Sequence, residues 1–273
     1  MWGIDTLSGR FVSINLTSTE GVAMATERML IWEGKSELDG SDIIVLATGV
    51  PKPSKHGNRA KSSANVKTGD MVQVYILRAY KAPLDVIREG LDESICGVCP
   101  HKSKASGGSG ACYVNVGQGP RSTWAAHQRS GSASFRLEAF AGQRVRFGAY
   151  GDPAAVPFEV WERIASVAEG VTGYTHQWRT ADPRFAQICM ASADSVAERR
   201  QARHKGYRTF RVRTASEARL NGEVTCPASR EAGYKTVCAT CMACGGTDNG
   251  RKQDITIIAH GATAKRFIPL ETI

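Results

Sequence analysis

The sequence predicts an α/β protein that forms a partial or complete parallel α/β barrel, with an open doubly wound sheet as the alternative. From residue 144 onward, apolar runs of strand length alternate with segments of helix length, a spacing typical of parallel βαβ units. The portion before residue 70 is instead rich in short apolar runs without helical periodicity. With 273 residues, 42% of them hydrophobic, the chain is long enough to bury one large core or two small ones.

The N-terminal portion is expected to be β-rich. Alternating or continuous apolar residues predict strands at 11–16, 29–33 and 42–47. Pro, Gly, Ser and Lys dominate residues 52–67, which predicts a basic loop that is either solvated or in contact with phosphate. We therefore assign residues 1–69 to a β-rich segment and 70–273 to a barrel-like, metal-binding domain.

The second portion begins with a strand rich in β-branched and aromatic residues at 71–77. The helix at 194–204 is expected to begin with Asp194 or Ser192 as its N-cap. The remaining pattern predicts helices at 83–90, 119–127 and 157–168, and strands at 144–150, 172–178, 186–192, 207–212, 223–226 and 254–260.

Ligands of parallel sheets bind at the carboxyl ends of the strands. The residues at these predicted ends are Asp152, His176, Ser192 or Asp194, Arg213, Cys226 and His260. We take Asp152, His176, Arg213 and His260 as candidate catalytic residues. Each has a structural alternative, since Asp152 precedes a proline in a turn, Asp194 is a good N-cap, and isolated histidines are often buried and hydrogen-bonded.

The densest motif is the cysteine-rich segment 226–246. It supplies four thiolates, from Cys226, Cys238, Cys241 and Cys244. Four thiolates fit either a tetrahedral zinc ion or a [4Fe–4S] cluster, and the short CxxCxxC spacing favours iron–sulfur. Because this segment follows the other predicted strand ends, we expect an accessory or structural metal site.

A sparser group lies upstream, at Cys96, Cys99 and Cys112. Three thiolates leave one iron of a cubane open, which suits a cluster that binds substrate or cofactor. With His101 as a fourth ligand, the group would equally form a closed Cys3His zinc site. Cys189 lies inside an apolar run and is expected to be a core residue.

Charge and the absence of export signals restrict the partners. The net charge of +9 favours a nucleic-acid or nucleotide partner, although a solvated basic surface is an equal alternative. No apolar run is long enough for a membrane span and the N-terminus has no signal-peptide pattern, so we expect no membrane partner and a cytoplasmic location. The sequence lacks the P-loop motif of NTPases, the GxSxG motif of serine hydrolases and the HExxH motif of zinc proteases.

The cysteine loop ending in Cys112-Tyr113, the later strand ending in GAYGDP and the strand–helix units that follow resemble the radical-SAM superfamily. In particular, the layout of residues 70–260 is similar to small radical-SAM-like barrel proteins of bacteriophages, with CxxC and a third cysteine in place of CxxxCxxC. The resemblance implies a [4Fe–4S] cluster on Cys96, Cys99 and Cys112 whose open iron binds S-adenosylmethionine. It also implies that Asp152, His176 or Arg213 orients the substrate or S-adenosylmethionine.

Three interpretations of the function follow, two of them with specific support in the sequence. One is a radical-SAM-like iron–sulfur enzyme acting on a nucleotide, nucleic acid or peptide. The other is a non-catalytic nucleic-acid-binding protein that zinc or iron–sulfur stabilises, because metal binding adds directly to folding free energy. A structural or host-interaction protein with metal sites that only hold the fold is a third reading.

Overall fold

A computed structural model describes residues 26–53, 67–267 and 269, which form two five-stranded sheets. In the first sheet, β1 to β3 pair antiparallel, whereas β3, β4 and β5 pair parallel. Its strands, in spatial order, are β1 (Thr26–Lys35), β2 (Asp42–Pro51), β3 (Val72–Arg78), β4 (Arg144–Tyr150) and β5 (Gly170–Thr172).

The second sheet is parallel throughout. Its strands, in spatial order, are β6 (Tyr174–Thr175), β7 (Met190–Ser192), β8 (Thr209–Arg213), β10 (Asp254–Ile258) and β9 (Glu223–Thr225). Strand β10 therefore inserts between β8 and β9, which precede it in the chain.

The two sheets meet at Gly173, the single residue between β5 and β6. The Gly173 carbonyl accepts a hydrogen bond from Met190 N–H at 2.9 Å. A Cβ atom at this position would lie 2.5 Å from Cys189 Sγ, closer than real contacts allow. A glycine is therefore required where the chain passes from one sheet to the other.

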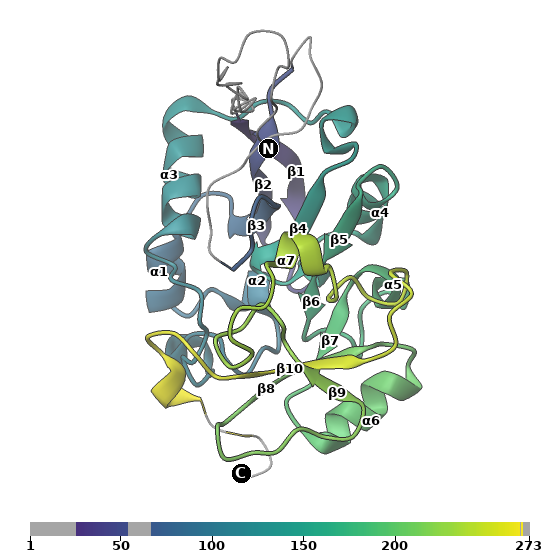
Figure 1. The fold of residues 1–273 in the computed structure, drawn as a ribbon. Helices are drawn as coiled ribbons and strands as arrows, with labels where there is room; N and C mark the ends of the chain where they lie inside the picture. The colour runs from purple at the N-terminus through teal and green to yellow at the C-terminus, as the bar shows by residue number, and fades with distance from the viewer. Residues whose placement is uncertain (1–25, 54–66, 268, 270–273) are drawn as a thin grey trace, which may run out of the picture.

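Short helices connect the strands (Figure 1). In Figure 1, α1 and α3 lie together on one side of the first sheet, and α4 lies on the other side. The α-helices are α1 (Pro83–Arg88), α2 (Glu93–Cys96), α3 (Gly119–Ser130), α4 (Phe158–Ala165), α5 (Phe185–Ile188), α6 (Val196–His204) and α7 (Cys238–Cys241). The 3-10 turns are η1 (Lys104–Ser106), η2 (Leu137–Phe140), η3 (Pro153–Ala155) and η4 (Ala264–Arg266).

Two apolar clusters hold the elements together. The larger one spans the first sheet and its helices, and includes Phe147 of β4 packed on Trp161 of α4 with ring centroids 4.7 Å apart. The smaller one joins Met190 and Ile255 of the second sheet to the cysteine-rich segment. The cysteine-rich segment is thus packed against the parallel sheet.

The predicted α/β class is confirmed, and β4 coincides with the predicted strand at 144–150. Within the described ranges no pairing closes either sheet on itself, so the sheets are open and a complete barrel is not formed. The predicted strand at 186–192 is wrong in its first half, where α5 forms and only Met190–Ser192 is extended. The predicted strand at 11–16 and most of the predicted loop at 52–67 lie outside the described residues.

The N-terminal strands are not a separate layer, because β2 pairs with β3 across the boundary predicted at residue 70. In the part of the chain that the structure describes, no helix has the length and apolar character needed to cross a membrane.

Candidate metal site

One cavity, with a volume of about 190 Å³, gathers most of the cysteines. Seven of the eight line it, and all eight are free of disulfide bonds. The lining cysteines are Cys96, Cys99, Cys112, Cys226, Cys238, Cys241 and Cys244. The two cysteine groups of the sequence thus face one space.

The upstream group is held by the loop that follows α2. Cys96 ends that helix, and Cys99 N–H donates to the Cys96 carbonyl at 3.1 Å. The Gln177 side chain clamps this turn, since its Nε2 donates to the Cys96 carbonyl at 3.1 Å and its Oε1 accepts from Val98 N–H at 3.3 Å. Cys112 N–H donates to the His101 carbonyl at 2.9 Å, which brings the third cysteine back to the first two.

Burial favours the neutral thiol form of Cys96 and Cys112. It raises the pKa of Cys96 well above its ordinary value, and the neighbouring Cys99 and Cys112 raise it further. The pKa of Cys112 is raised to about 11, again chiefly by burial. Since metals bind the thiolate, loading of this group would release protons and place positive charge beside the three sulfurs.

The downstream group is anchored to distant parts of the chain. Cys238 N–H, at the start of α7, donates to the Lys67 carbonyl at 2.8 Å. Gly173 N–H donates to the Cys244 carbonyl at 3.2 Å, and Cys226 N–H donates to the Thr256 carbonyl at 2.8 Å. These bonds hold the segment over the junction of the two sheets.

Burial raises the pKa of Cys226 and of Cys238, and brings the pKa of Cys244 to about 12. Tyr174 lines the same part of the cavity, and its nearby hydroxyl offsets part of the rise in the pKa of Cys244. Its phenol is buried, and this burial raises the pKa of Tyr174 well above its ordinary value.

Arg146 is a cavity residue that the sequence did not single out. Its guanidinium donates to the Tyr113 hydroxyl, whereas its Nε is buried without a hydrogen-bond partner. Burial alone would lower the pKa of Arg146, but the nearby Tyr113, Tyr174 and Cys238 raise it overall. The sequence did hold a signal for Arg146. Residues at alternate positions of a strand share one face, and Arg146 lies on the same face of β4 as Tyr150, which also lines the cavity.

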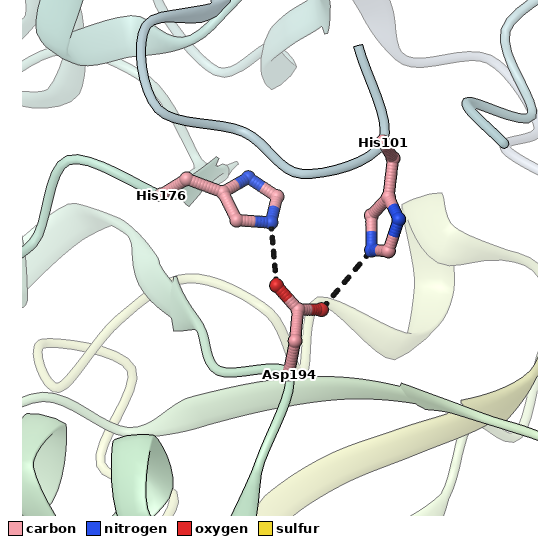
Figure 2. Close-up of side chains that lie close together, drawn as sticks. All are labelled: His101, His176 and Asp194. Atoms are coloured by element: carbon pink, nitrogen blue, oxygen red, sulfur yellow. Dashed lines mark hydrogen bonds and ion pairs between the residues drawn. The ribbon is translucent and has the colours of Figure 1, made fainter. Parts of the chain in front are cut away.

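Two histidines and an aspartate converge on one another (Figure 2), in the same cavity as the upstream cysteines. His101 Nε2 lies 3.1 Å from Asp194 Oδ1, and His176 Nε2 lies 3.1 Å from Asp194 Oδ2. The Asp194 side chain is only 4% exposed, so its charge depends on these partners. Burial would raise the pKa of Asp194, but His176 and His101 hold it well below its ordinary value.

Asp194 is not the N-cap of α6. That role belongs to Ser195, whose hydroxyl accepts from Glu198 N–H at 3.1 Å. The Asp194 carboxylate is therefore free of the helix and turns toward the histidines. Burial would lower the pKa of His176, but Cys99 and Asp194 raise it well above its ordinary value.

The other predicted catalytic residues divide into two sets. Asp152 and His260 line the cavity, and Arg213 is outside its lining. Asp152 caps η3 by accepting from Ala154 N–H at 3.0 Å, so its structural role as a turn residue is confirmed. Arg213 is held by the Glu231 carboxylate and by the Glu217 carbonyl.

The spacing of the ligand atoms distinguishes the groups. Among the described residues, His101, His176 and Asp194 form the one group of three or more potential ligands whose atoms all lie within 4.8 Å of one another. With Zn–S bonds of about 2.3 Å, the sulfurs around one tetrahedral zinc would be about 3.8 Å apart. Both cysteine groups are more open than this, and a cubane, whose thiolates bind separate irons at its corners, needs such a wider spacing.

A comparison of the chain with protein-family models, with curated proteins and with solved structures found no match.

Proposed function

We propose that this protein is an iron–sulfur enzyme, radical-SAM-like in layout, that acts on a small or nucleotide-like substrate in the cysteine-lined cavity. The observation that carries the proposal is the meeting of two remote cysteine groups in one cavity at the carboxyl ends of parallel strands. Strand ends of this kind are where α/β proteins bind ligands.

Each cysteine group has a role in this proposal. Cys96, Cys99 and Cys112 would hold a cluster with one open iron, and Cys226, Cys238, Cys241 and Cys244 would hold a second, fully ligated cluster. When bound, the clusters would supply electron transfer and an iron able to coordinate a ligand such as S-adenosylmethionine. Among the described residues, no three cysteine sulfurs lie within 4.8 Å of one another, and this favours clusters over single tetrahedral zinc ions.

The chain's own residues would bind and orient the substrate. Arg146 and Lys67 both line the cavity and favour a substrate with an anionic group, such as a phosphate or carboxylate. Tyr113 and His260 stack with ring centroids 5.5 Å apart in the same lining, and provide a surface on which a planar base could stack. A partial barrel around this cavity is the arrangement we propose.

The alternative, a non-catalytic nucleic-acid-binding protein, depends mainly on the net charge of +9. The most basic run of the sequence forms part of α6, and two of its arginines serve the fold. Arg199 and Arg203 both bind the buried Asp254 carboxylate, at 2.8 Å and 3.1 Å. This pairing reduces the support that the basic run gives to the alternative.

The test is the iron and acid-labile sulfide content of protein purified without oxygen. We expect both elements in the wild type, a loss of about half on Cys96→Ser, and little change on Cys189→Ala, the matched control outside the cavity. Cleavage of S-adenosylmethionine on reduction would extend the result to the reaction type. Stoichiometric zinc without iron or sulfide in the wild type would refute the proposal.

A further inference from the structure

The histidine–aspartate group beside the cysteines has a donor set of its own, two imidazole nitrogens and a carboxylate. We propose that His101, His176 and Asp194 bind one first-row divalent cation in a mononuclear site, distinct from the two cysteine groups. A two-histidine, one-carboxylate set with open positions is suited to Fe²⁺, and we assign that ion to it.

The distances between the donor atoms fit a single ion. Each histidine Nε2 lies 3.1 Å from an Asp194 oxygen, and all three ligand atoms lie within 4.8 Å of one another. Adjacent ligands of a six-coordinate ion with bonds of about 2.1 Å would be about 3 Å apart. A cation could therefore replace the two hydrogen bonds without a large movement of the side chains.

The imidazole rings are turned so that both face the same point. Figure 2 shows a nitrogen of each ring directed at the Asp194 carboxylate. The ring planes cross at 77° with centroids 5.8 Å apart, so the rings meet edge to face. Both Nε2 atoms are thus directed at the carboxylate, and an ion bound between them would replace the protons that they donate to it.

Each ligand is held from behind by other residues. Asp194 N–H donates to Glu198 Oε2 at 2.8 Å, and His176 N–H donates to Asp152 Oδ2 at 2.8 Å. The His101 ring packs on Phe267 with centroids 5.3 Å apart. Ligands fixed in this way lose little freedom when an ion binds, as in natural metal sites with supporting residues.

The site is buried but adjoins the cavity. The side chains of His101, His176 and Asp194 are 13%, 18% and 4% exposed, and all three line the cavity. Three protein ligands leave the remaining positions of a six-coordinate ion open on the cavity side, where a small ligand would bind. The donors are nitrogen and oxygen, whereas the neighbouring groups offer sulfur, so the two kinds of site select different metals.

The experiment must separate this site from the neighbouring thiols, because Cys99 lines the same cavity as His176 and raises the pKa of its imidazole. The probe is Co²⁺, added without oxygen to full-length protein that has been stripped of metal. A variant with Cys96, Cys99 and Cys112 changed to alanine is titrated beside the wild type. Cobalt bound by nitrogen and oxygen gives visible bands without the intense charge-transfer absorption of a cobalt–thiolate bond.

We expect the triple cysteine variant to bind one equivalent of Co²⁺ through nitrogen and oxygen, separate from any cobalt that Cys226, Cys238, Cys241 and Cys244 bind with thiolate charge transfer. Adding Asp194→Asn or His101→Gln to this variant should weaken that binding by at least about 10-fold. Loss of a residue that only supports a metal ligand already weakens binding by about 10-fold, and loss of the ligand itself should weaken it more. Asp182→Asn and His204→Ala serve as matched controls and should leave it unchanged, because they change a half-buried aspartate and an exposed histidine that do not line the cavity.

Retention of the same Co²⁺ affinity in both ligand variants would overturn the mononuclear site. So would a wild type and a triple variant that bind no cobalt outside thiolates, since the group would then hold only protons. The iron and sulfide content of the single Asp194→Asn variant separates this result from the proposed function, because the cysteine clusters should load normally in it.

Discussion

Gly173 sets the junction between the two sheets, and its substitution gives a sharp test of the fold. In Gly173→Ala, the new methyl group would lie 2.5 Å from Cys189 Sγ and 3.5 Å from Phe147 Cβ. Both neighbours are fully buried, so neither can move into solvent. Overpacking of a core by one carbon costs about 1–3 kcal/mol of unfolding free energy, and we expect a loss in that range.

The origin of the loss can be checked with a second substitution. Cys189→Ala removes the sulfur that the new methyl group meets, so the double variant should be more stable than the sum of the single effects predicts, by about 0.5–3 kcal/mol. Urea unfolding followed by circular dichroism and tryptophan fluorescence measures all four proteins. Gly117→Ala, where the nearest atom lies at 3.4 Å, is the control and should be neutral. Strict additivity of the two substitutions would refute the argument.

Two further predictions concern buried polar contacts. Asp254→Ala leaves the Arg199 guanidinium without the carboxylate it binds at 2.8 Å, and should lower the free energy of unfolding by about 3–5 kcal/mol in urea melts; an effect below about 1 kcal/mol would contradict a structural ion pair. Gln177→Ala removes the clamp on the Cys96 carbonyl and Val98 N–H, so Cys96 should be alkylated at least several-fold faster by iodoacetamide, as mass spectrometry can follow. An unchanged alkylation rate would show that the Gln177 side chain is not needed to keep the Cys96 loop in place.

The strand–helix alternation predicted the α/β class because each pattern has its own period. The segment 144–150 reads as a strand and is one, as β4. The prediction of a strand at 186–192 was partly wrong, because a short apolar run fits a buried helix turn as well as a strand. A helix and then a strand form there in succession. Barrel closure could not be predicted, since it depends on how the edge strands β1 and β9 are placed and not on the pattern within any one strand.

The rule that ligands bind at strand ends located much of the cavity. It selected Asp152, His176 and His260, all of which line it. It failed for Arg213, because the acidic Glu231 from a later segment holds that guanidinium. It also passed over Arg146, which lies within a strand and reaches the cavity only through the alternation of side chains across β4.

The contact between His101 and Asp194 was beyond the reach of the sequence for a simple reason. The two residues are 93 positions apart, and the sequence offered His101 as a partner for cysteines and Asp194 as a helix cap. Only the fold shows that Ser195 takes the capping role and leaves the carboxylate for the histidines.

Four cysteines of the segment 226–246, which the sequence predicted to be an accessory or structural metal site, line the same cavity as Cys96, Cys99 and Cys112. Its Cys244 carbonyl accepts a hydrogen bond from Gly173, the residue that joins the sheets. The junction therefore positions the downstream thiols and, three residues later, His176. If metals occupy both kinds of site, a change at Gly173 should alter iron–sulfur content and cobalt binding together, although Gly173 contributes a ligand to neither. A variant such as Gly173→Ala that lowers stability and leaves both metal contents intact would show that the cavity tolerates movement of the junction.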